Sequence, residues 1–205
     1  MTAFQDEHVP LTVVSSAEVF TGKVFNLRRD ELVLPHSQNT IVREYMSHPG
    51  AVVIVALRGN GGEEEILLER QYRHPVGAKL WEVPAGLLDI AGEDPLVGAQ
   101  RELAEEADLV AQQWDVLLDI FNSPGCSSES IRIFLARELS STGQVFDRED
   151  EEADFEYRWV RLDDAVSAAL DGRLHNASTV CAVLATDAAR RRGWELREIT
   201  SSWLR

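Results

Sequence analysis

Residues 101–106 read RELAEE, and this hexapeptide carries more structural information than any other part of the chain. It places three carboxylates and one guanidinium on a predicted helix, shortly after the tripeptide PAG at 84–86. On a helix, Glu102 and Glu106 lie one turn apart on the same face, and Glu105 lies at the edge of that face. Like charges at this spacing weaken a helix. Such a cluster beside a glycine loop indicates a site for Mg²⁺, which binds through carboxylates and substrate phosphates. The alternative is a solvated helix face, because Glu and Arg are good helix formers that are mostly exposed.

The bulk composition is that of one globular domain with a small appendage. The chain has 205 residues, of which 44% are apolar and 27% are charged. Its 20 basic and 35 acidic residues give a net charge of −15. This charge argues against nucleic-acid binding, which needs a basic surface. It allows a small anionic substrate if metal ions and local arginines supply positive charge. No apolar run approaches the roughly 20 residues that a helix needs to span a membrane.

Cysteine usage and the N-terminal sequence favour a cytoplasmic location. Cys126 and Cys181 lie far apart without metal-ligand spacing, so neither a disulfide nor a zinc site is expected. The first ten residues are acidic and polar, and they lack the apolar core of a secretion signal.

The strand predictions centre on residues 51–57, AVVIVAL, a continuous apolar run typical of a fully buried strand. A turn signal at 59–62 predicts a hairpin between this strand and residues 66–73. Residues 1–15 are expected to form a loose lead-in, and the last residues carry no pattern. Further strands are predicted at 18–34 with a break at Gly22, and at 40–45, 80–83, 114–121, 131–137 and 156–162.

Three helices are predicted. The first begins with Asp94 as N-cap and Pro95 in the first helical position, and it runs to about Ala107. The others are expected at 163–170 and 177–192, each closed by a glycine. Strands of both kinds with helices packed on them indicate the α/β (α+β) class, with a mixed sheet in a sandwich.

The surroundings of the hexapeptide closely resemble the Nudix box, Gly-x5-Glu-x7-Arg-Glu-U-x-Glu-Glu-x-Gly-U, where U is a bulky apolar residue. The matching residues are Gly86, Glu93, Arg101, Glu102, Leu103, Glu105, Glu106 and Leu109. Two departures occur: six residues rather than five separate Gly86 from Glu93, and Asp108 replaces the closing glycine. The extra residue falls in a loop, where insertions are tolerated, and Asp adopts left-handed backbone more readily than most residues. Both departures are therefore expected to leave the chemistry intact.

The resemblance implies a Nudix-type α/β/α sandwich that hydrolyses a nucleoside diphosphate linked to another group. Glu102, Glu105 and Glu106 would hold Mg²⁺, with Mn²⁺ as the alternative ion, and the carbonyl of Ala85 would be a further ligand. Arg101 would brace the loop and the helix together with Glu93 and orient a glutamate.

Pro124 narrows the implied substrate. It lies 16 residues after Asp108, in the loop SPGCSSE at 123–129. Pro-Gly by itself indicates only a turn. Nudix proteins that cleave ADP-ribose carry a proline at this offset in a similar loop, so the resemblance implies an ADP-ribose pyrophosphatase. Glu129 would then be an acidic residue on the substrate side of the site. It would either contact the ligands of the metal or associate with the metal itself.

The acidic segment at 148–154 offers a general base. Most of its carboxylates are expected to be solvated. The ADP-ribose branch, however, places a catalytic glutamate on a mobile loop before the penultimate strand. Glu152 is the best match and Glu151 the next, and the residue would accept a proton from the attacking water or hold that water in line.

The segments QYR at 71–73 and WEVPAG at 81–86 also resemble this branch. They imply that Arg73 meets a phosphate and that Glu82 fixes a ribose hydroxyl or bears on the metal. For Arg43 and Arg28, phosphate contact and plain surface charge weigh equally. Adenine would stack on Tyr72 or Phe25, although core packing is the commoner role of such aromatic residues.

The N-terminal residues resemble the extra β region that these enzymes exchange between two subunits. This implies a homodimer in which residues 1–45 form the exchanged β-rich segment and residues 46–205 form the hydrolase domain, so that each active site is built partly from the other chain.

The leading hypothesis is Mg²⁺-dependent hydrolysis of ADP-ribose to AMP and ribose 5-phosphate. The enzymatic alternative is a Nudix hydrolase of another nucleoside diphosphate sugar, such as a GDP- or ADP-sugar. The non-enzymatic alternative is a module that binds ADP-ribose without cutting it, which would be expected to lack some of the glutamates at 102, 105 and 106. All three are present.

Overall fold

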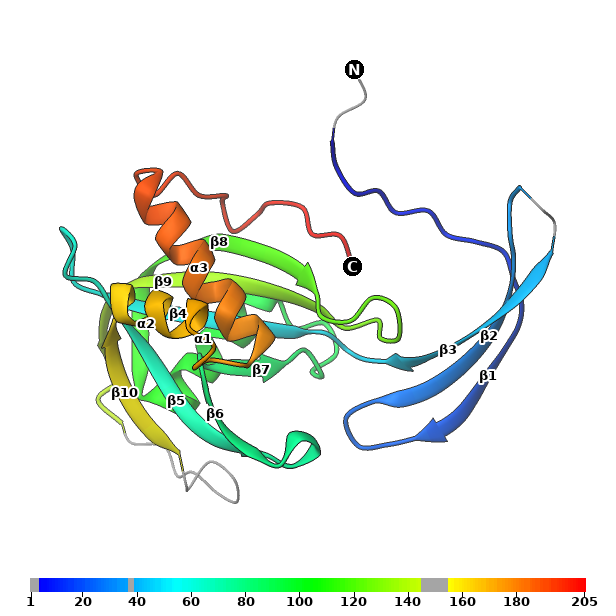
Figure 1. Cartoon of the computed structure of the whole chain (residues 1–205), viewed down its shortest axis with the longest axis horizontal. Helices are drawn as coiled ribbons and strands as arrows, with labels where there is room; N and C mark the ends of the chain where they lie inside the picture. Colours follow the sequence, from blue (N-terminus) through cyan, green and yellow to red (C-terminus); the bar gives the residue numbers. More distant parts are fainter. Residues whose placement is uncertain (1–3, 37–38, 145–154) are drawn as a thin grey trace.

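The protein consists of a helix-covered sheet and a projecting arm of three strands (Figure 1). The computed structural model describes residues 4–36, 39–144 and 155–205. The arm contains β1 (Val13–Thr21), β2 (Asn26–Val33) and β3 (Thr40–Ser47), all antiparallel. The main sheet contains β4 (Ala51–Arg58), β5 (Glu65–Arg73), β6 (Ala78–Glu82), β7 (Ala85–Leu87), β8 (Leu109–Phe121), β9 (Ser130–Ser141) and β10 (Glu156–Arg161). The helices are α1 (Pro95–Ala107), α2 (Leu162–Leu170) and α3 (Ala177–Arg191), with a short 3₁₀ turn at His74–Val76.

The main sheet is mixed. Its strand order is β10-β5-β4-β9-β8, with β6 paired to β5 and β7 paired to β4. Strands β4 and β9 run parallel, and the other pairs are antiparallel. A parallel pair needs a long crossover connection. The connection between β4 and β9 contains β5, β6, β7, α1 and β8.

Strand β4 divides the core into two layers. Alternate side chains of a strand point to opposite faces, so Val53 and Val55 pack with α2 and α3, whereas Val52 and Ile54 pack with α1. The expected buried strand and the expected α/β/α sandwich are therefore both confirmed.

Helix α1 has the predicted ends. The side chain of Asp94 accepts a hydrogen bond from the backbone N–H of Leu96 at 2.9 Å, and Pro95 is the first helical residue. The helix ends at Ala107, and Asp108 follows in the left-handed region with φ 54° and ψ 31°. Asp108 thus occupies the backbone conformation for which the box normally uses glycine.

Other boundaries differ from the prediction. Strand β8 begins at Leu109 rather than at 114, and β9 continues to Ser141 rather than stopping at 137. These extensions pair with each other, from Leu109 with Ser141 to Gln113 with Arg137, and this pairing joins residues that lie far apart in the sequence. The expected hairpin is short, because β4 pairs with β5 only at Leu57–Ile66 and Arg58–Glu65. Strand β1 starts at Val13, inside the expected lead-in.

The C-terminal residues pack against the sheet, although their sequence shows no pattern. The carbonyl of Arg197 accepts a hydrogen bond from the N–H of Val116 in β8 at 2.9 Å. The ring of Trp203 lies 5.0 Å from the guanidinium of Arg132, which forms a bidentate ion pair with Asp119. The tail therefore covers part of the edge strand.

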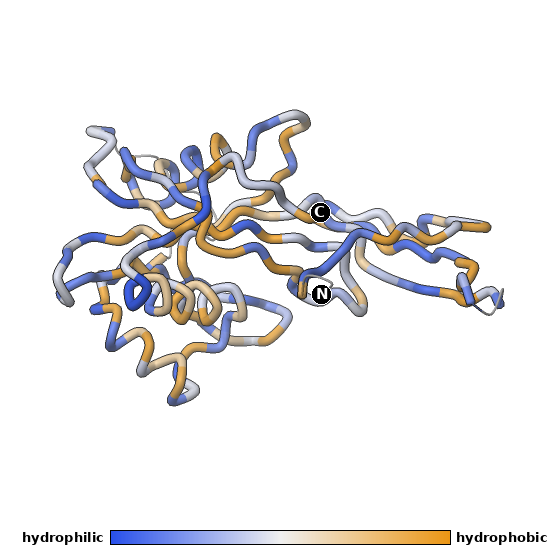
Figure 2. Tube along the Cα trace, turned by 90° about the horizontal axis from the view of Figure 1, so that it is seen from above, coloured by the Kyte–Doolittle hydropathy of each residue, from blue (hydrophilic) through white to orange (hydrophobic). Residues whose placement is uncertain are grey.

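The arm contains hydrophobic segments (Figure 2), and several of its apolar side chains are exposed. Among the described residues of the arm, Asp30 is the one charged residue that is buried, and it accepts hydrogen bonds from the hydroxyls of Ser16 and Tyr45. Both hydrogen bonds hold the pKa of the Asp30 carboxyl below its usual range, and the bond from Ser16 has the larger effect. The exposed apolar residues of the arm are Val13, Val14, Val19, Phe20, Val24, Phe25, Leu27 and Val42.

Within the three described ranges, no helix combines the length and the apolar composition that a membrane span requires.

Candidate active site

The hexapeptide lies on α1, directly against the short strand β7. The carboxylate of Glu102 packs on Gly86 so closely that a Cβ built on Gly86 would lie 2.1 Å from the Glu102 Cδ atom. A side chain at position 86 and the observed position of Glu102 therefore exclude each other. Glycine at position 86 therefore allows the Glu102 carboxylate to take this position.

Glu106 fixes the same loop from the next turn of α1. One of its carboxylate oxygens accepts a hydrogen bond from the backbone N–H of Ala85 at 3.0 Å, and the residue is 7% exposed. On the other side, the carbonyl of Pro84 accepts a hydrogen bond from the N–H of Ile54 in β4 at 2.8 Å. The backbone at Ala85 is thus held between the central strand and the acidic helix.

Arg101 balances the charge of the cluster. Its guanidinium contacts Glu93 through two hydrogen bonds of 3.2 Å, Glu102 at 2.7 Å and Glu105 at 3.0 Å. These contacts raise the pKa of Arg101 above its ordinary value, and the hydrogen bonds with Glu93 have the largest effect. The pair with Glu93 is the expected brace between the loop and the helix.

The loop between Gly86 and Glu93 accommodates its additional residue in a turn just before Glu93. The N–H of Glu93 donates to the carbonyl of Ile90 at 3.1 Å, which closes a tight turn. From there the Glu93 carboxylate lies against Gly98 of α1, where an added Cβ would approach an oxygen to 2.9 Å. Glu93 therefore reaches Arg101 despite the longer loop.

The donor set suits a hard divalent cation. Glu102, Glu105, Glu106 and the carbonyl of Ala85 offer only oxygen atoms, which Mg²⁺ prefers, and the absence of a side chain at Gly86 lets the Glu102 carboxylate lie against this loop. Glu102 and Glu105 contact Arg101, and Glu106 contacts the backbone of Ala85. Over the described parts of the chain, no three acidic, histidine or cysteine side chains converge as metal ligands do.

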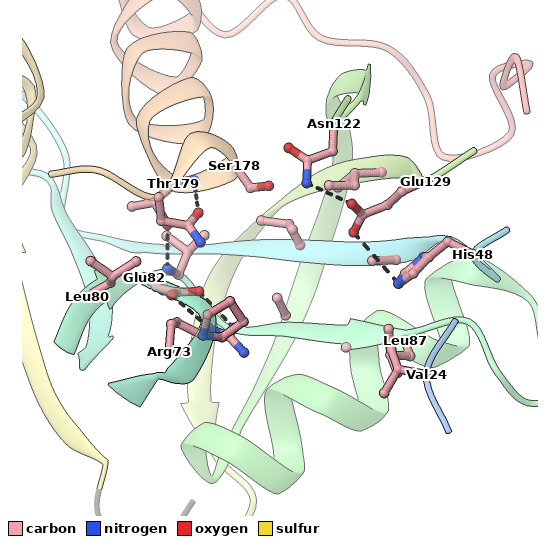
Figure 3. A pocket seen from close by; sticks show the side chains of 18 of the residues that line it. Val24, His48, Arg73, Leu80, Glu82, Leu87, Asn122, Glu129, Ser178 and Thr179 are labelled. Carbon is pink, nitrogen blue, oxygen red and sulfur yellow. Dashed lines mark hydrogen bonds and ion pairs between the residues drawn. The ribbon is translucent and has the colours of Figure 1, made fainter. Parts of the chain in front are cut away.

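A pocket of about 550 Å³ opens beside this loop (Figure 3). Its floor is apolar, and its two ends are polar. One end carries Arg73 and Glu82, and the other carries His48, Asn122 and Glu129. The remaining lining residues are Val24, Ala51, Val53, Pro75, Val76, Leu80, Val83, Ala85, Gly86, Leu87, Ile131, Asn176, Ser178 and Thr179.

Arg73 and Glu82 form a bidentate ion pair across β5 and β6. The Nε and Nη2 atoms of Arg73 donate to the two oxygens of Glu82 at 3.0 and 2.9 Å. The Glu82 side chain is 4% exposed, whereas that of Arg73 is 42% exposed. The buried carboxylate therefore fixes the orientation of a guanidinium that lines the pocket.

The sequence analysis missed several residues that line the pocket. It named Glu129 but not His48, Asn122 or Thr179, which also line the pocket. Thr179 accepts a hydrogen bond from the N–H of Val83 at 3.1 Å and so ties α3 to the connection between β6 and β7. The HPG turn at 48–50 was the available signal for His48, since it directly precedes the buried strand.

Two of the expected substrate residues do not line the pocket of their own chain. Pro124 lies exposed in the loop between β8 and β9, and this loop is anchored to β3 by the backbone bonds of Met46. Arg43 lies exposed on β3 of the arm.

The other residues expected to contact the substrate or to act as the base lie in the arm, on β5 and in the acidic segment. Arg28 donates to Ser16 within the arm, and the Tyr72 hydroxyl contacts the Nδ1 atom of His74 at 3.3 Å. Phe25 and Tyr72 are both exposed. The proposed bases Glu152 and Glu151 lie outside the described residues.

Comparisons with known proteins agree with this geometry. Residues 46–183 match the NUDIX domain. The ADP-ribose pyrophosphatase of Mycobacterium tuberculosis is 40% identical over 191 residues, which cover 93% of this chain and 90% of that protein. The methanol dehydrogenase activator of Bacillus methanolicus is 34% identical over 170 residues, which cover 83% and 89%. A crystal structure of an ADP compounds hydrolase shares the fold, with a TM-score of 0.73 and 20% identity over 93% of this chain and 100% of that chain.

The contact between Gly86 and Glu102 predicts a cation-binding defect. In Gly86→Ala, the new Cβ displaces the Glu102 carboxylate, and Mn²⁺ binding followed by electron paramagnetic resonance should weaken by about 10- to 100-fold. Gly125→Ala is the matched control, because its Cβ would meet no atom within 4 Å. Wild-type Mn²⁺ affinity in a folded Gly86→Ala variant would show that the cation does not bind at the Glu102 carboxylate.

Proposed function

The chain belongs to the NUDIX-domain family, and we propose that it hydrolyses the pyrophosphate of ADP-ribose to AMP and ribose 5-phosphate with Mg²⁺. The observation that carries this proposal is the packing of Glu102 on Gly86, with Glu106 on Ala85, at the edge of a pocket that contains Arg73. The relative that is 40% identical over most of both chains is named for the same reaction.

Members of this family generally use a divalent cation, and the finer choice of Mg²⁺ is part of the proposal. Glu102, Glu105, Glu106 and the Ala85 carbonyl would hold the ion, with Arg101 setting the orientation of Glu102 and Glu105. When bound, the ion neutralises the charge of the pyrophosphate, activates water and stabilises the leaving phosphate.

The pocket provides the binding groups of the substrate. A volume of about 550 Å³ lies in the range of small-molecule sites. Arg73 faces the pocket with a guanidinium already oriented by Glu82, so it can bind a phosphate oxygen without losing further side-chain freedom. At the other end, Glu129 would accept hydrogen bonds from sugar hydroxyls. Pro124 would act through the shape of the loop that carries Glu129.

The acidic segment would supply the base. In the proposal, Glu152 accepts a proton from the attacking water or holds that water in line, and Glu151 is the alternative. The cluster on α1 cannot provide this group while its carboxylates hold metal ions and Arg101.

We further propose a homodimer in which residues 1–45 pack on a second copy. The exposed apolar side chains of the arm support this, since contiguous exposed apolar surface marks interaction sites. Arg43 would then reach the substrate of the partner chain, which agrees with its position outside the pocket lining of its own chain. The cytoplasmic location stays a prediction.

Loss of a metal-binding carboxylate should abolish turnover. Glu102→Gln and Glu106→Gln are expected to lower kcat by on the order of 10²-fold or more while the protein stays folded. A glutamine at 106 keeps an oxygen that accepts the Ala85 N–H. Glu195→Gln makes the same charge change on an exposed residue and should leave the rate of AMP release unchanged. Unchanged rates in both test variants would rule out the metal site on α1.

The base is tested by comparing two neighbours. Glu152→Gln should lower kcat by about 10²- to 10⁴-fold with little change in ADP-ribose binding, because general-base catalysis acts on the chemical step. Glu151→Gln should retain most activity. A large loss in Glu151→Gln with none in Glu152→Gln would move the role to Glu151.

The dimer is tested by light scattering at micromolar concentration. The expected mass is twice the 22.9 kDa of the chain. Replacing Val19 and Phe20 by serine should favour the monomer, because both side chains are exposed on the arm. A monomeric wild-type protein would remove the proposal of a shared active site.

A further inference from the structure

We propose that His48 is a positioning residue that holds Glu129 in the orientation needed to bind a vicinal diol of the substrate. This inference rests on the proposed function, since it concerns the sugar end of the same pocket. Figure 3 shows His48 and Glu129 facing each other at the end opposite Arg73. His48 lies just before β4, and its side chain is 11% exposed.

The ring of His48 is fixed by its own turn. The backbone N–H of Gly50 donates a hydrogen bond to Nδ1 of His48 at 3.1 Å. Gly50 has φ +97°, a conformation that side-chain-bearing residues rarely adopt, and a Cβ there would lie 3.2 Å from the carbonyl oxygen of Ser130. The glycine therefore allows the turn that returns its N–H to the imidazole.

This hydrogen bond decides which ring nitrogen carries the proton. A nitrogen that accepts an N–H has no proton of its own, so the neutral ring is protonated at Nε2. The Nε2 atom lies 4.0 Å from an oxygen of Glu129. The single donor of the imidazole thus faces the carboxylate at a separation longer than a hydrogen bond. In the proposal, a rotation of either side chain closes this gap when the substrate binds.

The second oxygen of Glu129 is held by Asn122. Its amide nitrogen donates to that oxygen at 2.7 Å, and the backbone of Glu129 is tied to Asn122 and to the hydroxyl of Ser127 at 3.1 Å each. Ser128 also accepts the backbone N–H of His48 at 3.0 Å. The turn at His48 and the loop that carries Glu129 therefore form one cross-linked unit.

This unit suits a sugar with adjacent hydroxyls. An ionised carboxylate offers about four lone-pair positions, two on each oxygen. With Asn122 bound to one oxygen of Glu129 and His48 to the other, each oxygen keeps one position that can accept a hydrogen bond from the substrate. Two hydroxyls on neighbouring carbons can occupy such a pair of acceptors. Because these contacts form with the sugar and not with the reacting phosphorus, His48 should affect substrate binding more than the chemical step.

The two nitrogens of His48 can be tested separately. Asparagine keeps an acceptor near Nδ1 for the Gly50 N–H but has no donor that reaches Glu129. Glutamine places a donor near Nε2 but has no acceptor in the turn. His48→Asn is expected to raise KM for ADP-ribose about tenfold with kcat nearly unchanged, as for loss of a charge-assisted hydrogen bond. His48→Gln should stay within about threefold of wild-type KM, with a lower thermal midpoint.

The controls separate this inference from the proposed function. If wild-type protein releases no AMP from ADP-ribose, the proposed function fails, and the tautomer of His48 still tests the geometry by ¹⁵N NMR at a pH where the ring is neutral. The proposal expects a proton on Nε2, and a proton on Nδ1 would overturn it. Equal KM defects in His48→Asn and His48→Gln, or wild-type KM in His48→Asn, would also overturn it.

Discussion

The contact between the Glu102 carboxylate and Gly86 is the constraint on which the rest of the site depends. It joins α1 to β7 without any intervening side chain. Glu106 completes the joint by binding the N–H of Ala85, and β4 holds Pro84 from the other side. The acidic helix is thereby fixed against the central strand. The pocket beside it is lined by Ala85 and Gly86 of this joint and by Ala51 and Val53 of β4.

Charge explains why this cluster is stable before a cation binds. Three glutamates within one turn of a helix repel one another, and Arg101 offsets this by contacting two of them and Glu93. The protein as a whole carries a net charge of −15 and would repel an anionic substrate. In our account, bound cations and Arg73 reverse that effect locally.

The sequence predicted features that depend on local chemistry. The N-cap at Asp94, the left-handed Asp108 and the buried strand β4 each follow from a few adjacent residues. The parallel pairing of β4 with β9, the long β8 and the packing of Trp203 on Arg132 join residues far apart in the chain, and no local pattern encodes them. His48 was missed for the same reason. Its partner Glu129 lies on a distant loop, and only the fold brings the two together.

Cation-dependent hydrolysis of a pyrophosphate beside the carboxylates of α1 can be followed by mass spectrometry of the products, with the protein, ADP-ribose and Mg²⁺ incubated in ¹⁸O-labelled water. We expect equal amounts of AMP and ribose 5-phosphate, one labelled oxygen in one of the two products, and no turnover once divalent cations are chelated. Intact ADP-ribose, release of free ADP, or turnover that persists in chelator would disprove this mechanism.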